Sequence, residues 1–181
     1  MLMCILFAVL LVQSADQTEP ELFNRLLKEQ DQTNKIRLIE DFSEKYPRSI
    51  LLDEAFTLAM SIFVERGDTA GVLAYGERAI RANSDAIDAL VNLSRQYAVE
   101  GRNLKRALEY ARRAIEVVGR DMNKAPPSGY RVAEWKRYLE EMKATAEGTV
   151  KYIEMMTNTV LRPKKGPGRG GDLNDIFVRH Q

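Results

Sequence analysis

The stretch that indicates the fold most directly is residues 90–118, LVNLSRQYAVEGRNLKRALEYARRAIEVV. Leu90, Leu93 and Tyr97 recur at the spacing of one face of an α-helix. Gly101 then permits the left-handed backbone that ends many helices. A second run keeps the same spacing with smaller residues, namely Ala107, Leu108, Ala111, Ala114 and Ile115. The stretch therefore predicts two helices joined by a short turn.

A similar layout occurs earlier in the chain. Residues 56–67 match residues 90–101: a bulky residue, an apolar residue three positions later, an aromatic residue and a terminal glycine. The two glycines, Gly67 and Gly101, lie about 34 residues apart. The helices that should follow share an Ala-Ile pair, at 79–80 and at 114–115. A period of this size is typical of stacked helix pairs.

The helical period extends over most of the chain. Between Glu19 and Val118 apolar residues recur at three- and four-residue steps, and no run alternates strictly as a strand would. Pro47 and the two glycines are expected to end helices. Three side chains are expected to cap first-turn amides, namely Asp53, Ser84 and Asp85.

These motifs resemble the tetratricopeptide repeat over about residues 19–118. The closest match is Leu90–Val118, in which ALEYARRAI at 107–115 is similar to the second helix of the family's repeat. Residues 56–82 match less well, because Val72 and Gly76 replace a preferred alanine and a frequent aromatic. Residues 36–47, IRLIEDFSEKYP, resemble another second helix with its closing proline. The resemblance implies an all-α fold of antiparallel helix pairs, stacked as a short right-handed solenoid with a concave binding face and no inherent chemistry.

The first helix of each pair would line that concave face. By spacing from the aligned aromatic residues, the predicted groove comprises Glu54, Thr57, Ser61, Glu65, Asp88, Val91, Asn92, Arg95 and Val99. Several members of the family hold a partner's terminal carboxylate with lysine and asparagine here, and only Asn92 and Arg95 are suited to such a role in this chain. The alternative for each of these residues is an ordinary solvated surface.

The pattern changes after Val118. Residues 121–129 contain two prolines and a glycine, which predicts a loop. Residues 128–161 predict a C-terminal helical segment, as one helix or two, with Gly148 as a joint or a close contact. We expect this segment to cap the last repeat, and a partner surface around Trp135 is the alternative. The tail, 162–181, is basic and begins with a Gly/Pro-rich run at 163–171, which predicts disorder and either solvation or attraction to an anionic surface.

The first residues predict export. Residues 1–12 are a continuous apolar run, MLMCILFAVLLV, with the small residues Ser14 and Ala15 behind it. Such a run would rise about 18 Å as a helix, too short for a hydrocarbon core of about 30 Å. Residues 1–15 therefore read as a signal peptide of a periplasmic or secreted protein, although no basic residue precedes the run. The alternatives are a retained membrane anchor and a buried core segment. Cys4, the single cysteine, would leave with the signal.

Composition argues against catalysis. The net charge is +1, from 27 basic and 26 acidic residues, without the surplus of a general nucleic-acid binder. The single histidine is His180 in the tail, so no positioned imidazole supports a triad or a metal site. No phosphate or dinucleotide glycine motif is present. Adjacent carboxylates at 40–41 and 140–141 would point about 100° apart on a helix and favour solvent. We expect no enzyme activity, cofactor, metal or small-molecule substrate.

The function predicted from the sequence is a non-catalytic scaffold that binds a protein or peptide in the groove. One alternative is a structural subunit of an envelope assembly. The other is a membrane-tethered adaptor, which requires that residues 1–15 are retained.

Overall fold

The structure is a computed structural model that describes residues 17–161, and all regular secondary structure in this range is α-helical. The prediction of an all-α fold is confirmed. The helices are α1 (Glu19–Lys28), α2 (Gln32–Lys45), α3 (Leu52–Glu65), α4 (Thr69–Ala82), α5 (Ile87–Val99), α6 (Leu104–Asp121) and α7 (Val132–Leu161). The predicted signal peptide (1–15) and the predicted disordered tail (162–181) lie outside the described residues.

Local sequence explains where α3 and α5 end. Gly67 and Gly101 adopt φ angles of +65° and +63°, which an L side chain rarely accepts. The amide of the residue after each glycine returns to a carbonyl of the last helical turn: Asp68 N donates to Phe63 O at 2.9 Å, and Arg102 N donates to Tyr97 O at 3.1 Å. The two predicted glycine stops are therefore confirmed.

The predicted helix caps are wrong. The N-cap residues of α3 and α5 are Leu51 and Ala86, and neither makes a side-chain cap. Side-chain caps occur on α2 and α4, where Asp31 accepts from Asn34 N at 2.7 Å and Asp68 accepts from Gly71 N at 3.1 Å. None of the residues predicted as caps makes a cap. Asp85, for example, pairs with two arginines of α6 instead.

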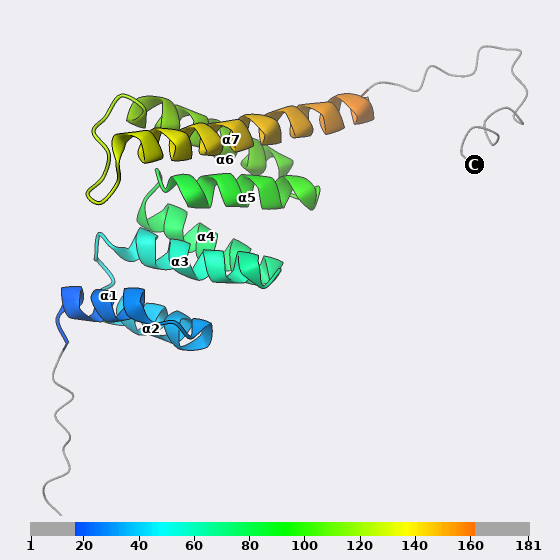
Figure 1. Cartoon of the computed structure of the whole chain (residues 1–181). Coiled ribbons are helices and arrows are strands. Elements are labelled where there is room, and N and C mark those ends of the chain that lie inside the picture. Colours follow the sequence, from blue (N-terminus) through cyan, green and yellow to red (C-terminus); the bar gives the residue numbers. More distant parts are fainter. Residues whose placement is uncertain (1–16, 162–181) are drawn as a thin grey trace, which may run out of the picture.

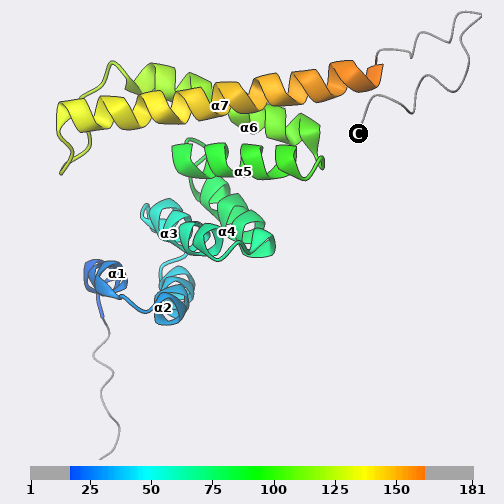
Figure 2. The same ribbon diagram turned by 45° about the vertical axis from the view of Figure 1, so that its right-hand side comes forward.

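The helices follow one another along the molecule from α1 at one end to α7 at the other (Figures 1 and 2). Consecutive helices pack together throughout, and α7 packs on both α5 and α6. One cluster of buried apolar residues joins α1 to α4 and reaches Ala89 of α5. Two further clusters join α5, α6 and α7, to which α7 contributes Leu139, Ala146 and Ile153.

Gly76 lets α4 and α5 approach closely. A Cβ atom at this position would lie 2.7 Å from Leu93 Cγ, and Leu93 is completely buried. Leu93 thus fills the space that an aromatic residue at position 76 would need. The glycine at position 76 thus has a packing reason in this chain.

α7 is a single helix that continues through Gly148 without a break. Both ribbon views show that it extends beyond the ends of α5 and α6 (Figures 1 and 2). Of the two sequence alternatives for residues 128–161, one long helix is therefore correct, and it begins at Val132. No helix of residues 17–161 combines the length and the apolar character needed to cross a membrane.

Candidate functional site

α7 lies across part of the face of α5 that was predicted to line an open groove. The Tyr138 hydroxyl of α7 donates a hydrogen bond to Asp88 Oδ2 of α5 at 2.8 Å. Burial raises the pKa of the Asp88 carboxyl, and the Tyr138 hydrogen bond opposes this shift. Val91, one turn further along α5, is 3% exposed and belongs to the core that α5 shares with α6 and α7. These two predicted groove residues therefore face α7.

The three remaining α5 residues of the predicted groove differ in accessibility. Asn92 is half-buried, and its Nδ2 donates to Asp88 O of its own helix at 2.8 Å. Arg95 is exposed, and no hydrogen bond or ion pair holds its guanidinium within residues 17–161. Val99 is 68% exposed. Arg95 and Val99 are thus the accessible part of the α5 face.

A recess of about 330 Å³ lies between this part of α5 and the second half of α7. We call it the α5–α7 recess, and it is lined by Arg95, Ala98, Val99, Thr145, Gly148, Thr149 and Tyr152. The tyrosine is 41% exposed, so the recess presents apolar surface from both helices to solvent. The sequence prediction included the two α5 residues Arg95 and Val99 but missed the α7 wall.

Gly148 lies on the α7 wall of this recess. A glycine inside a helix costs about 0.5–1 kcal/mol relative to alanine. No packing contact requires it, because a Cβ atom at Gly148 would meet nothing within 4 Å. The sequence suggested that Gly148 forms a joint between two helices or a close contact. Neither role is seen, because α7 is continuous here and no atom of another described helix lies within 4 Å of the Cβ position. The glycine instead leaves room inside the recess, and its position in mid-helix was the one signal that could have indicated the α7 wall.

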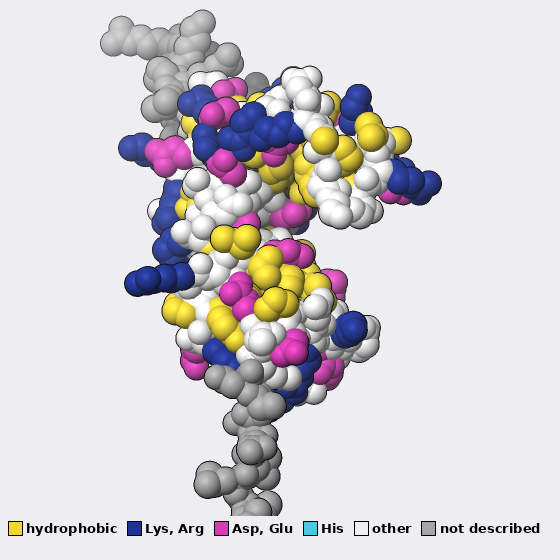
Figure 3. All heavy atoms as spheres, turned by 90° about the vertical axis from the view of Figure 1, so that its left-hand side faces the viewer, with side chains coloured by type: hydrophobic (Ala, Val, Ile, Leu, Met, Phe, Trp, Pro, Cys, Tyr) yellow, Lys and Arg dark blue, Asp and Glu magenta, His cyan; other side chains and the backbone are white. Residues whose placement is uncertain are grey.

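The α3 part of the predicted groove stays accessible. Glu54 and Ser61 are exposed and Thr57 is half-buried. Glu65 accepts a hydrogen bond of 2.8 Å from Gln32 Nε2 at the start of α2, so it is anchored to the neighbouring helix. In the space-filling view the surface is hollowed between the half that bears α1 and the half that bears α7, and hydrophobic side chains gather beside the hollow (Figure 3).

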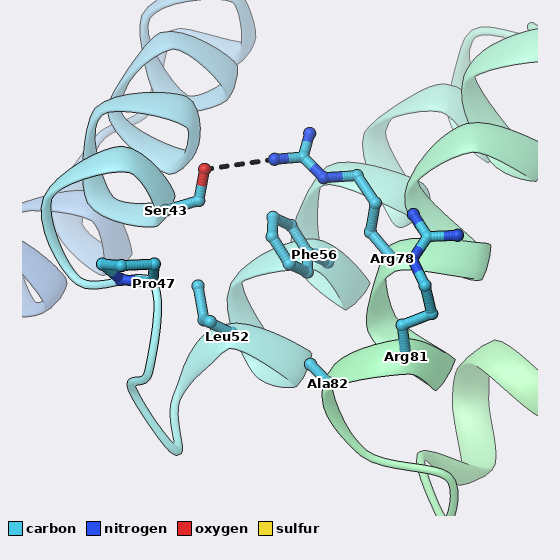
Figure 4. Close-up of a pocket in the computed structure, with 7 residues that line it drawn as sticks. All are labelled: Ser43, Pro47, Leu52, Phe56, Arg78, Arg81 and Ala82. Atoms are coloured by element: carbon cyan, nitrogen blue, oxygen red, sulfur yellow. Dashed lines mark hydrogen bonds between the residues drawn. The ribbon is translucent and has the colours of Figure 1, made fainter.

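A second recess, also of about 330 Å³, lies where α2, α3 and α4 meet (Figure 4). Two arginines line it. Arg78 is already neutralised, because it donates to the Glu40 oxygens at 2.5 and 2.8 Å and to Ser43 Oγ at 3.1 Å, whereas Arg81 is exposed at the rim. The Arg78 guanidinium also lies 4.1 Å from the ring centroid of Phe56. Glu40, expected on the solvent face, is instead half-buried, and the Arg78 hydrogen bond lowers its pKa.

The two recesses differ in what they offer a ligand. In the α2–α4 recess the apolar floor is closed, since Leu52 and Phe56 are 8% and 6% exposed. In the α5–α7 recess apolar surface is open and Arg95 has no counter-ion among residues 17–161. An unpaired guanidinium beside accessible apolar side chains suits a ligand that has both a carboxylate and an apolar group. We therefore take the α5–α7 recess as the candidate site.

The side chain of Trp135, at the centre of the alternative partner surface, already packs against other residues of the chain. Its ring stacks on Tyr138 with centroids 5.1 Å apart, and Tyr130 contacts its edge at 5.4 Å. The indole packs against the core shared by α5, α6 and α7. Its Nε1 is buried without an acceptor in the described part of the chain.

Several titratable groups of the described residues form ion pairs between segments that are distant in the sequence. Glu77, for example, accepts hydrogen bonds from Arg106 at 2.7 Å, Tyr97 at 2.9 Å and Tyr110 at 3.0 Å. Burial and the Glu77 hydrogen bond raise the pKa of Tyr97 to about 12. Between residues 17 and 161 no group of three or more histidine, cysteine, aspartate or glutamate side chains is placed to hold a metal ion.

No protein-family model matches the chain, and no curated protein is significantly similar to it.

Proposed function

We propose that this chain is a non-catalytic interaction scaffold of the tetratricopeptide type, in which the helix pairs α1–α2, α3–α4 and α5–α6 stack as a solenoid and α7 caps the last pair. The short connections and the packing of consecutive helices support this arrangement. So does the shared position of the two glycine stops, Gly67 and Gly101.

The observation that carries the binding function is the α5–α7 recess. It combines the guanidinium of Arg95, which has no counter-ion among residues 17–161, with the exposed side chains of Val99 and Tyr152 and the open space at Gly148. A stretch of peptide that carries a carboxylate and a bulky apolar side chain matches these features. The carboxylate would accept hydrogen bonds from Arg95, and the apolar side chain would fill the space over Gly148.

A random-peptide display library, selected against the full-length chain, tests this proposal without knowledge of the natural partner. Selected peptides are synthesised with a fluorophore, and their Kd is measured by anisotropy. We expect selected sequences to share an acidic residue near a bulky apolar one. Arg95→Ala and Gly148→Gln should each weaken binding about tenfold, which corresponds to about 1.4 kcal/mol.

The chain provides a matched control for each variant. Arg112 is an exposed arginine of α6, and Gly119 is an exposed glycine of α6 that also has nothing within 4 Å of its Cβ position. Arg112→Ala and Gly119→Gln should leave the Kd within about twofold, well below the 1.4 kcal/mol of a tenfold change. Equal affinity of the selected peptides for Arg95→Ala, Gly148→Gln and the parent would exclude the α5–α7 recess as the binding site.

A further inference from the structure

We infer that the α5–α7 recess binds a segment of the same chain, residues 172–179 (DLNDIFVR), and that this segment competes there with other peptides. The inference rests on the proposed function, because it names one occupant of the proposed site and a means of regulating it.

The chemistry of this segment complements the recess. Residues 162–171 contain four basic residues, at 162, 164, 165 and 169, and no acidic one, whereas residues 172–179 contain Asp172, Asp175 and the apolar run Ile176–Val178. Within the described residues Arg95 has no counter-ion, and the space over Gly148 is open. We assign the Asp175 carboxylate to Arg95 and the Phe177 ring to the space over Gly148.

The spacing of these two residues suits one recess. In an extended peptide, side chains two positions apart point to the same side, and each residue advances the chain by about 3.3 Å. Asp175 and Phe177 would thus reach points about 7 Å apart on the same surface. Val178 would point to the opposite side, which makes it a matched control for Phe177.

The connection is long enough for the segment to return. Along α7, at about 1.5 Å per residue, Leu161 lies roughly 14 Å beyond Tyr152 and roughly 24 Å beyond Thr145. A Gly-rich linker of the length of residues 162–174 has a root-mean-square span of about 20 Å. Because the span of the linker matches this distance, the local concentration of the segment reaches the millimolar range. A weak intrinsic affinity is then sufficient for occupancy.

Paramagnetic relaxation enhancement in the full-length chain tests the inference directly. A nitroxide label is placed on Gln181→Cys in a Cys4→Ser background, and the chain is labelled uniformly with nitrogen-15. We expect the label to broaden the amide signals of residues 95–99 and 145–152 at least twofold more than those of α1 and α2. The broadening should persist in Val178→Ser and should be lost in Phe177→Ser.

Two outcomes would overturn the inference. One is the absence of selective broadening near the recess. The other is the same broadening in a mixture of two chains, one with the nitroxide at natural isotopic abundance and one with nitrogen-15 but no nitroxide. That result would show a second copy as the occupant.

A peptide-binding measurement separates this inference from the proposed function. If the segment competes, Phe177→Ser should bind library-selected peptides about tenfold more tightly than Val178→Ser does, which corresponds to about 1.4 kcal/mol. Equal affinities without selective broadening would overturn the inference and leave the proposed function intact. Selective broadening in a chain that binds no selected peptide would support the inference and contradict the proposed function.

Discussion

The hydroxyl of Tyr138 donates a 2.8 Å hydrogen bond to the carboxylate of Asp88, and these two residues join α7 to α5. Asp88 is largely buried, and its pKa is raised above the ordinary value of an aspartate. A carboxyl whose pKa is higher in the folded than in the unfolded chain stabilises the folded state at low pH. This contribution is complete below the pKa that the group has in the unfolded chain, and it is lost as pH rises through the pKa that the group has in the folded chain.

Tyr138→Phe tests this junction. Removal of the hydroxyl leaves a buried carboxylate with one hydrogen bond fewer, which should lower the free energy of unfolding at pH 7 by about 1.5–3 kcal/mol. The Asp88 pKa should rise further in the variant, so the loss should shrink as pH falls and be smallest below about pH 3.5, where aspartate is protonated in the unfolded chain too. Urea unfolding from pH 3 to 8 measures this. Tyr130→Phe, at a 51% exposed tyrosine, should show no such pH dependence.

Tyr97 provides a test of the α5–α6 core. It is 7% exposed, and its hydroxyl donates to Glu77 Oε1 at 2.9 Å. Tyr97→Ala should destabilise the protein by about 3–5 kcal/mol because it removes a large aromatic group from the core. Tyr97→Phe keeps the ring and should cost only about 1 kcal/mol for the lost hydrogen bond. A urea midpoint of Tyr97→Ala equal to that of the parent would contradict the burial described for this residue.

Two helical glycines should respond to alanine with opposite sign. At Gly76 the new Cβ would lie 2.7 Å from Leu93 Cγ, so Gly76→Ala should destabilise by about 1–3 kcal/mol. At Gly148 the space is open, so Gly148→Ala should stabilise by about 0.5–1 kcal/mol. Thermal unfolding of the two variants beside the parent measures both changes. A destabilising Gly148→Ala would mean that the α7 backbone needs glycine there.

Sequence predictions that depend on local interactions were correct more often than those that depend on tertiary packing. The helix ends at Gly67 and Gly101 were predictable because the left-handed backbone is a local requirement that few residues other than glycine satisfy. The caps were mispredicted because aspartates occur near several helix starts, and Asp85 is used by Arg113 and Arg120 of α6 instead. Only tertiary packing selects between these uses.

The candidate site was predictable only in part, for a similar reason. The period of residues 128–161 predicts an apolar stripe, yet it does not specify which earlier helix that stripe covers. Asp88 has the character of a surface residue and is nevertheless placed under α7. Arg95 and Val99 remained accessible because they lie beside Gly148, where α7 has no side chain.

The two polar anchors predicted on α5 should contribute unequally to binding. Asn92→Ala with Arg95→Ala should weaken capture of a library-selected peptide about tenfold or more, on the order of 1.4 kcal/mol. Most of this loss should come from Arg95, because the Asn92 amide already donates within its own helix. Anisotropy titrations of both single variants and the double variant measure the division. Undiminished binding by a folded double variant would direct the search to the exposed α3 face.

The export prediction is tested independently of the fold. Residues 1–15 are expected to be absent from the protein recovered outside the cytoplasm, because the apolar run at residues 1–12 has the length of the apolar part of a signal peptide. Intact-mass spectrometry of that protein identifies the new first residue. A chain of full mass in the membrane fraction would favour the tethered adaptor instead.

The position of α7 has a consequence for biosynthesis. α5 meets α4 and α6 as soon as these helices have formed, but its Asp88 and Val91 face is covered by the last helix of the described chain. At about 5–20 residues per second, several seconds separate the synthesis of α5 from that of α7. During this interval the nascent chain leaves exposed the apolar side chains of α5 that later pack in one core with α7, among them Val91.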